Sequence, residues 1–478
     1  MRKNGILNGL FSAPEELACR NSGVDNEPQQ YRSMFMRDRD RVLYSKSFRR
    51  LSGKTQIYLS GSDDHQRNRL THTLEVAQIS ATISNALGLD NDLTEAIALG
   101  HDIGHTPFGH AGEQELHLLL TPENVIKMLD DDAAEIYDKE AFGFKHNLQS
   151  VRLAVTLENI YGTVGLDLTN FTLWGIQRHS SDRYGKGKMT ATTYLKPTIY
   201  NKYNEYFYFK DKPLTEAWSF EAFVVAEADE IAQLHHDLED AIRGGAMSKE
   251  DVTQTIRKFL SKIMCNEDLA LLKKMDTQTM DDETYIVYLS RVVVNTLVNN
   301  IIEVSIKNLN YLVNKYCLNE KNIISFFLEH KPTEPEIMNA ISYTTLENPT
   351  DLFKKQRKYS ETIATKVHNS YKVQRMNTKG QYVIKKLFQA YYANPQQLPN
   401  HSVIQYLIAM DQYASKENAM NTFVRKGEGV VRTKFVEFQK DKASQTIEAK
   451  IELMRVICDH IASMTDKYAL EEFKRLYN

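Results

Sequence analysis

The chain has 478 residues, of which 42% are hydrophobic, which is enough for a sizeable core and suggests two to three domains. Its formal net charge is −3 with 25% charged residues, so no overall basic field points to nucleic acid. The four cysteines are far apart and form no CxxC pair, which argues against a disulfide framework or a zinc ribbon. The N-terminus is too polar for a signal peptide and no run of about 18 apolar residues occurs. We therefore expect a cytoplasmic protein without a transmembrane helix.

Residues 1–36 show no clear periodicity, and we expect them to form an irregular N-terminal segment. Arginine then becomes frequent. Over residues 36–41 the simplest interpretation is a solvated helix with internal ion pairs. Arg49, Arg50 and Lys54 instead surround a glycine-containing turn, which favours contact with a polyanion.

Two consecutive helices come next along the chain. The first spans about residues 68–88 and places His72 on the same face as apolar side chains. The second runs from Asp92 to Gly100, opens with the capping-box pattern of residues 92–95, and leads into His101 and Asp102. Helices joined by a short turn are antiparallel neighbours, so the start of the first should lie beside the end of the second. His72 should therefore meet His101 and Asp102.

The stretch GHDIGHTPFGHAGE, residues 100–113, holds three histidines, an aspartate and a glutamate among four glycines and a proline. Imidazole and carboxylate groups in a turn suit a divalent metal, whereas histidines that only cap helices are the simpler alternative. His110 and Glu113 are three residues apart at the head of a further helix, so they face the same way. A glutamate there can fix the tautomer of the histidine and raise its basicity, as proton transfer requires.

Residues 219–241 are predicted to form one long helix ended by Gly244 and Gly245. Asp229 lies mid-helix among apolar neighbours, where an unpaired carboxylate is costly, so it is the best candidate for a fourth metal ligand. Residues 144–150 start another amphipathic helix, and the aromatic run 203–209 could form a small hairpin. From about residue 250 the pattern is helix after helix, for example at residues 285–304 and 449–464.

The order His72, His101-Asp102, Asp229 resembles that of the HD-domain metal-dependent phosphohydrolases. The match extends to RDRDRVLYSKSFRRLSGKTQI, NRLTHTLEVAQI, HDIGHTPFGHAGE, EADEIAQLHHDLEDA and VICDHIASMTDKYAL, which together look like the deoxyguanosine triphosphate triphosphohydrolase (dGTPase) family. These motifs run from about residue 37 to residue 470, so the resemblance covers nearly the whole chain.

The resemblance implies an all-α fold, with an HD-domain catalytic core at residues 37–245 and a helical region at 246–478 that completes the substrate pocket and the oligomer contacts. It implies hydrolysis of a deoxynucleoside triphosphate, dGTP first, to deoxynucleoside and inorganic triphosphate, which would control dNTP pools. The cofactor would be Mn²⁺ or Mg²⁺, with iron as a further possibility. The metal ligands would be His72, His101, Asp102 and Asp229. The catalytic residues would be His110, Glu113 and His105, with His105 against the α-phosphate. The substrate-binding residues would be Arg69, Arg50, Lys54, Gln56, His146, Asn147, Arg178, Gln233 and Asp237.

Two positions depart from the family pattern. Gln233 stands where these enzymes usually place a tyrosine under the sugar, which leaves open how ribonucleotides are excluded. Arg178 and His179 stand where many bacterial members have Lys-Tyr, which keeps the charge and alters its geometry.

As partners, the resemblance implies the nucleotide substrate, a homo-oligomer (a hexamer in the family) and an effector that could be single-stranded DNA or a nucleotide, with no membrane. One alternative is another HD phosphohydrolase acting on nucleoside monophosphates, cyclic nucleotides or guanosine tetraphosphate. A second is a single-stranded nucleic-acid-binding regulatory protein without turnover. Hydrolysis of a panel of nucleotides, with product analysis, distinguishes the first alternative from a triphosphohydrolase. Salt-sensitive binding of single-stranded DNA by a variant lacking Asp102 would indicate the second.

Overall fold

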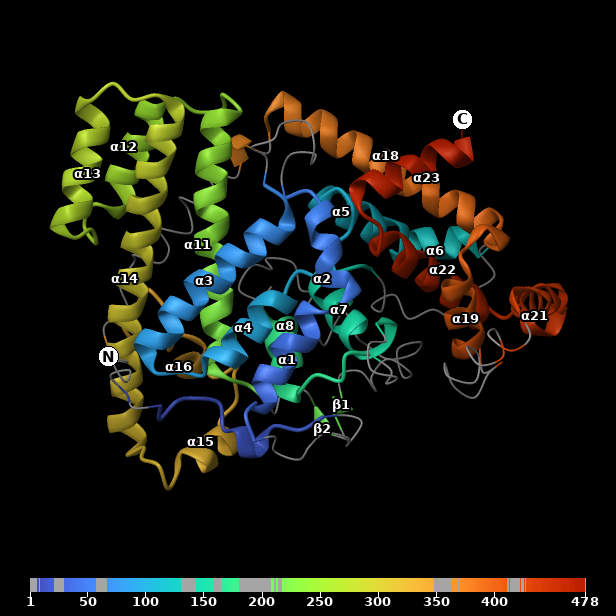
Figure 1. Ribbon diagram of the computed structural model, residues 1–478, viewed down its shortest axis with the longest axis horizontal. Coiled ribbons are helices and arrows are strands. Elements are labelled where there is room, and N and C mark those ends of the chain that lie inside the picture. The colour runs from blue at the N-terminus through green and yellow to red at the C-terminus, as the bar shows by residue number, and fades with distance from the viewer. Residues whose placement is uncertain are drawn as a thin grey trace.

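Helices make up nearly all of the regular structure, as the computed structural model in Figure 1 shows. It describes residues 9–20, 30–56, 67–129, 143–158, 165–179, 217–347, 369–410 and 427–477, with a few isolated residues between them. Within these, only β1 (Tyr208–Phe209) and β2 (Lys212–Pro213) form strands, paired antiparallel. The all-α prediction is confirmed. The predicted hairpin begins at the end of its aromatic run, and residues 203–207 lie outside the described residues.

The helices of the N-terminal half are α1 (Met34–Leu43), α2 (Lys46–Arg50), α3 (Arg69–Leu87), α4 (Asn91–Gly100), α5 (Gly109–Leu119), α6 (Pro122–Met128), α7 (His146–Arg152), α8 (Asn170–Arg178) and α11 (Phe220–Arg243). Those that follow are α12 (Lys249–Leu260), α13 (Asn266–Thr277), α14 (Asp282–Tyr316), α15 (Ile323–Glu329), α16 (Pro335–Met338), α18 (Tyr371–Ala393), α19 (Asn400–Ala409), α21 (Glu428–Lys440), α22 (Ile447–Ala462) and α23 (Asp466–Tyr477).

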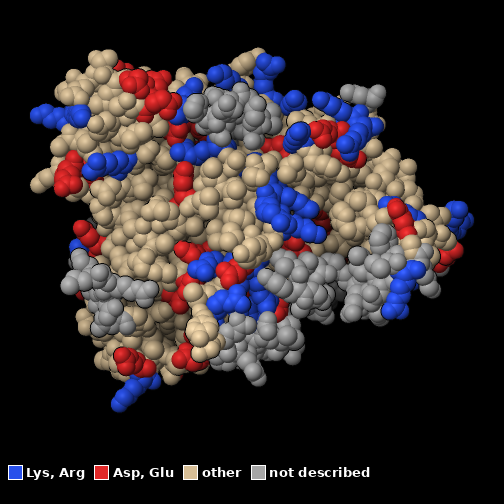
Figure 2. Space-filling view, viewed as in Figure 1, with Lys and Arg blue, Asp and Glu red and all other residues tan. Residues whose placement is uncertain are grey.

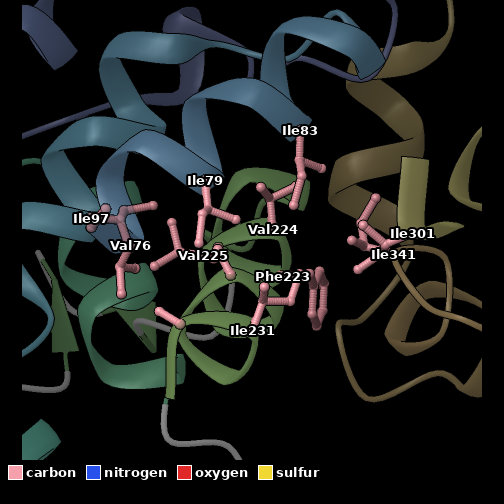
Figure 3. Close-up of a cluster of buried hydrophobic side chains, with 14 of the residues drawn as sticks. Val76, Ile79, Ile83, Ile97, Phe223, Val224, Val225, Ile231, Ile301 and Ile341 are labelled. Carbon is pink, nitrogen blue, oxygen red and sulfur yellow. The ribbon is translucent and has the colours of Figure 1, made fainter. Parts of the chain in front are cut away.

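The first hydrophobic core is built by α1, α3, α4, α8, α11 and α14. Apolar side chains at helical spacing on each element point inward, as Figure 3 shows for Val76, Ile79 and Ile83 of α3, Ile97 of α4, Phe223, Val224, Val225 and Ile231 of α11, and Ile301 of α14. Burying each such side chain contributes about 1.5–3 kcal/mol. This core holds α3, α4, α8 and α11 together, and the predicted metal ligands lie on or directly after α3, α4 and α11.

Two glycines, one on each helix, let α4 and α8 approach closely. A Cβ atom added to Gly175 of α8 would lie 2.4 Å from the side chain of Ile97, and one added to Gly100 of α4 would lie 2.5 Å from Ile176. Any larger residue would therefore push the two helices apart. Because His101 directly follows α4 and His179 directly follows α8, this contact also sets how near the two histidines come.

A second core is formed by α5, α6, α18, α19, α21, α22 and α23. Its orange and red helices lie at the opposite end of the molecule from α14 in Figure 1. Buried polar contacts join it to the first half of the chain. Asp459 of α22 pairs with Arg152 of α7 at 2.6 Å, and Asp466 of α23 accepts hydrogen bonds from the backbone N–H groups of Thr55 and Phe108, each at 2.9 Å. The predicted division at residues 245 and 246 stays a prediction.

Helix α14 is the one described helix that is long and apolar enough to cross a membrane by length and composition. It has 35 residues, and half of its most apolar window is buried inside the protein. In the fold it packs against α11, α13 and α3 as a core helix does. It is therefore weak evidence for a membrane span.

Three local predictions differ from the structure. The solvated helix expected at residues 36–41 is wrong, since Arg37, Asp38 and Arg41 are buried and Arg41 pairs with Asp167 at 3.1 Å. The capping residue of α4 is Asp90, whose side chain accepts from the backbone N–H of Leu93, so the capping box placed at residues 92–95 is wrong. Asp92 is instead drawn into an ion pair with Arg39 at 2.8 Å. The helix predicted at residues 285–304 is much longer, since Asp281 caps it and Cys317 ends it in a left-handed conformation.

Candidate metal centre and catalytic pair

The four predicted metal ligands come together. His72 on α3, with His101 and Asp102 just after α4, form a buried group whose ligand atoms lie within 4.8 Å of one another. An oxygen of Asp229 on α11 lies 3.0 Å from Nε2 of His72 and 3.9 Å from Nε2 of His101. The antiparallel arrangement of α3 and α4 was predicted from the short turn between them, and it is what brings His72 to His101.

The hydrogen-bonding pattern of His101 suits a metal ligand. Its Nδ1 lies 2.6 Å from the carbonyl oxygen of Ala98, which can only accept, so Nδ1 carries the proton in the neutral ring. Its buried Nε2 then presents a lone pair and has no hydrogen-bond partner among the described residues. That lone pair faces carboxylate oxygens of Asp102 at 3.6 Å and Asp229 at 3.9 Å. A divalent cation between these groups removes the repulsion, and backbone support of this kind is usual for metal-bound histidine. The residues therefore fit a metal.

Both carboxylates of this cluster are held ionised. Burial alone would raise the pKa of Asp102, but its electrostatic interactions with His105, His101 and Arg69 outweigh burial and hold that pKa well below its usual range. Burial likewise opposes ionisation of Asp229, whereas the hydrogen bond from His72 and the electrostatic interaction with His101 lower its pKa. Ionised oxygens are the form that binds a hard or borderline cation.

Arg69 lies one turn before His72 and reaches the same cluster. Its NH1 lies 2.5 Å from an oxygen of Asp102, and the side chain is almost fully buried. Its Nε and NH2 atoms have no hydrogen-bond partner among the described residues. Two N–H groups of a buried guanidinium are thus available to an anion that approaches the cluster.

The predicted pair of His110 and Glu113 is also formed. Nδ1 of His110 lies 3.2 Å from an oxygen of Glu113, and the same oxygen lies 3.1 Å from Nδ1 of His146. Glu113 is buried, whereas the His110 side chain is 58% exposed. Burial opposes ionisation of Glu113, but its electrostatic interaction with His146 and the hydrogen bond from His110 hold its pKa well below its usual range. An ionised, fixed carboxylate therefore orients an accessible imidazole, which is the arrangement of a general acid or base.

His105 lies between the metal-ligand cluster and the catalytic pair. Its ring stacks on that of His146 with centroids 3.9 Å apart, and its Nε2 lies 3.4 Å from an oxygen of Asp102. Burial and the charge of Arg69 lower the pKa of His105 well below its usual range. The ring is therefore neutral at pH 7 and can donate or accept one hydrogen bond.

The other residues predicted to bind substrate contact neighbouring side chains and backbone. Gln56 donates to Gln233 at 3.0 Å, and Gln233 donates to Asp237 at 2.8 Å, which forms a polar chain along one face of α11. Asn147 donates to the carbonyl oxygen of Gln177 at 2.9 Å. The guanidinium of Arg178 lies over the ring of Phe223 at 5.6 Å.

The side chain of Lys54 points into the protein, although its place near a turn suggested contact with an anion. It is 1% exposed, and its ammonium group donates to the carbonyl oxygens of His105 and Ala462. Burial, followed by the charges of Arg50 and Arg69, lowers its pKa to about 7. In this conformation it ties a backbone loop to α22 and does not point to an anion. Arg50 is partly exposed, and lysine and arginine side chains gather near α2 on the face drawn in Figure 2.

Some residues that shape the centre have only weak signals in the sequence. Asp459 and Asp466 lie in VICDHIASMTDKYAL, far from the centre along the chain, so no spacing rule could place them there. A further group of His235, His236 and Glu75 lies beside His72, with the rings of His72 and His236 5.2 Å apart. His179 was visible only as a neighbour of Arg178, yet it lies 3.3 Å from His146.

The HD domain family matches residues 69–276, and the phosphohydrolase-associated domain matches residues 347–420 and 430–475. A deoxyguanosinetriphosphate triphosphohydrolase-like protein of Syntrophus aciditrophicus is 30% identical over 455 residues, which cover 95% of this chain and 89% of the relative. The chain belongs to this triphosphohydrolase-like family. Relatives with the same description in Agrobacterium fabrum and Bordetella pertussis are 29% and 28% identical, over 94% and 100% of this chain.

Membership of the family makes the chain an HD-domain phosphohydrolase, a class that depends on a metal. The matched HD segment begins at Arg69 and contains His72, His101, Asp102 and Asp229. The predicted family is thereby confirmed.

Proposed function

We propose that this chain hydrolyses deoxynucleoside triphosphates, with dGTP preferred, to deoxynucleoside and inorganic triphosphate. The observation that carries the proposal is the accessible His110, fixed by buried Glu113, beside a buried His-His-Asp cluster. The names of the relatives contain this reaction class, and the proposed preference for dGTP is taken from them.

We infer that His72, His101, Asp102 and Asp229 hold one divalent ion, Mn²⁺ or Mg²⁺, with iron as the further option. A bound divalent ion would polarise a phosphoryl oxygen and position a water. Arg69 lies against Asp102, so its two available N–H groups would bind an oxygen of the phosphate nearest the cluster. His105, a buried neutral imidazole next to Asp102, would bind a second oxygen of the same phosphate.

In this proposal His110 is the general acid. Its ring contacts Glu113 through Nδ1, which leaves Nε2 for the substrate, and more than half of its side chain is exposed. The Nε2 proton would pass to the 5′-oxygen of the deoxynucleoside as the bond to the α-phosphorus breaks. The Glu113 carboxylate stabilises the charged ring before transfer and orients the neutral ring afterwards.

The polar chain of Gln56, Gln233 and Asp237 would hold the sugar. It continues the face of α11 that carries Asp229, because residues four apart on a helix lie one above another. Oε1 of Gln56 is buried without a hydrogen-bond partner among the described residues, so it could accept from a sugar hydroxyl. Arg50, Asn147 and Arg178 are proposed to border the phosphates, and Lys54 would act there only after leaving its two carbonyl partners.

The testing experiment identifies the bond that breaks. Each of the four deoxynucleoside triphosphates, a ribonucleoside triphosphate and guanosine tetraphosphate are incubated with enzyme in heavy-oxygen water, and the products are analysed by mass. We expect dGTP to give deoxyguanosine without label and inorganic triphosphate with one heavy oxygen. Release of orthophosphate or pyrophosphate as the first product, or label in the nucleoside, would contradict the proposal. Turnover of guanosine tetraphosphate alone would favour the alternative HD phosphohydrolase.

Assembly into a homo-oligomer, a hexamer by resemblance, stays a prediction. The same holds for a nucleotide or single-stranded DNA effector and for a cytoplasmic location.

A further inference from the structure

Asp102 belongs to two groups of side chains that could each hold a metal. The first is the group with His72 and His101. The second joins Asp102 to His146 at the start of α7 and His179 at the end of α8, with all three residues buried and their ligand atoms within 4.8 Å of one another.

His179 repeats the local geometry of His101. Each residue directly follows a helix, α8 or α4, in the C-cap position. In each, Nδ1 lies 2.6 Å from the carbonyl oxygen three residues earlier, Ile176 for His179 and Ala98 for His101. A carbonyl can only accept, so this contact fixes the proton on Nδ1 and turns Nε2 toward the centre. The ring centroids of His101 and His179 lie 4.9 Å apart, so their Nε2 atoms point to neighbouring positions.

His146 is oriented from the opposite side by Glu113. Its Nδ1 lies 3.1 Å from an oxygen of Glu113, and its backbone N–H donates to the other oxygen at 3.3 Å. A carboxylate that accepts the Nδ1 proton of a histidine is the usual support for a metal ligand, because it fixes the tautomer and increases the basicity of Nε2. The ring of His105, stacked on His146, limits rotation of the imidazole.

The two Nε2 atoms of His146 and His179 lie 3.3 Å from each other. With both Nδ1 protons directed at acceptors, two neutral rings would bring two lone pairs together. One cation bound to both nitrogens and to an oxygen of Asp102 satisfies all three groups at once. An extra proton between the two nitrogens is the competing explanation, and the experiment below separates the two.

We propose that Asp102, His146 and His179 bind a second divalent metal ion next to the first, with Asp102 shared between the two. Two imidazoles and a carboxylate suit Mn²⁺, Fe²⁺ or Zn²⁺ better than Mg²⁺, which prefers oxygen ligands. Ions that share a carboxylate in hydrolytic sites are typically about 3.5–4 Å apart, and they clamp the attacking and leaving oxygens of a displacement. The inference rests on the proposed function only in taking His72, His101 and Asp229 as the remaining ligands of the first ion.

The role of Glu113 follows from the same geometry. One of its oxygens contacts both His110 and His146, so the group that orients the proposed acid also orients a ligand of the second ion. Loss of Glu113 would therefore weaken metal binding at the second position as well as proton transfer. The earlier assignment of His146 to substrate binding would then change, because its Nε2 would meet the metal.

The test counts metal in the full-length protein and uses no nucleotide. Chelator-treated protein is reloaded with Mn²⁺ alone, freed of excess ion, and analysed for manganese per chain and by electron paramagnetic resonance. Wild type should bind two ions and give the spectrum of a coupled manganese pair. His179→Phe should bind one and give the six-line spectrum of an isolated ion. His179→Gln provides a second variant in case the larger ring disturbs folding.

The matched control is His235→Gln, since His235 with His236 and Glu75 forms another group that could attract an ion. It should keep two ions and the coupled spectrum. One manganese per wild-type chain with a six-line spectrum would overturn the proposal and leave the shared proton as the explanation. Two ions that fall to one in His235→Gln, with both His179 variants unchanged, would also overturn it. If wild type binds two coupled manganese ions but hydrolyses none of the deoxynucleoside triphosphates, the proposed reaction is refuted and the second metal site is retained.

Discussion

Glu221, in the first turn of α11, should make the first core less stable as the pH rises. Its side chain is 0% exposed, and one oxygen accepts from the backbone N–H groups of Ala13 at 3.0 Å and Asp90 at 2.9 Å. Its other oxygen is buried without a hydrogen-bond partner among the described residues. Burial, only partly opposed by these two hydrogen bonds, raises the pKa of this carboxyl from 4.5 to about 7.

The sign and size of the effect follow from proton binding. Because the folded-state pKa is raised, the folded protein holds a proton that the unfolded chain has released. The resulting stability is full below pH 4.5 and is lost as the pH rises through about 7. The interval between the two pKa values corresponds to about 3 kcal/mol of unfolding free energy. Most of this, about 2–3 kcal/mol, should disappear between about pH 5 and pH 8.

The assay is urea unfolding of wild type and Glu221→Gln from pH 5 to pH 8, followed by tryptophan fluorescence. Both tryptophans, Trp174 and Trp218, are buried in the first core, so the signal reports that core. Other groups titrate in both proteins, so the difference between the two proteins isolates Glu221. The variant should gain stability relative to wild type as the pH rises. Glu267→Gln, at an exposed first-turn position of α13, should show no such change. A difference that stays constant across this range would refute the reasoning.

Three further outcomes are expected. Asp229→Ala should lose both turnover and the metal ion bound by His72, His101 and Asp102. Metal analysis measures this loss, and full metal occupancy in the variant would contradict the assignment of Asp229 as a ligand. His110→Ala should keep its metal and lose roughly 10²–10⁴-fold in rate, whereas loss of metal would mean that His110 is a ligand. Asp466→Ala leaves the buried N–H groups of Thr55 and Phe108 without their acceptor, at about 1–3 kcal/mol each. Calorimetry should therefore show a lower unfolding temperature, and an unchanged one would mean that water replaces the carboxylate.

The metal cluster could be predicted because its members depend on local rules. A short turn makes α3 and α4 antiparallel, and an i, i+3 spacing on α5 makes His110 face Glu113. Asp229 stood out as a carboxylate among apolar residues. It is less buried than that argument assumed, since 27% of its side chain is exposed.

Other features depend on contacts between distant segments. His179 comes near His101 because glycines let α4 and α8 pack closely, and a sequence pattern does not show which helices touch. Lys54 looked like an anion contact because a basic residue near a turn usually faces solvent. It is buried because α22 covers it and supplies the carbonyl of Ala462. The capping residue of α4 was misplaced by two positions, since both Asp90 and Asp92 are good capping residues.

The proposed metal ligands and the proposed general acid lie beside different hydrophobic cores, and one loop connects them. Ile103 packs in the first core, just after the ligands His101 and Asp102, whereas Phe108 packs in the second, just before His110. Phe108 holds a left-handed conformation with φ of 62°, which costs a non-glycine residue energy. Asp466 accepts the N–H of Phe108 at 2.9 Å, and Gly380 lets α18 lie against this side chain, because a Cβ added to Gly380 would be 2.8 Å from Cβ of Phe108. The C-terminal helices therefore fix the turn that sets the distance between the proposed acid and the metal ligands.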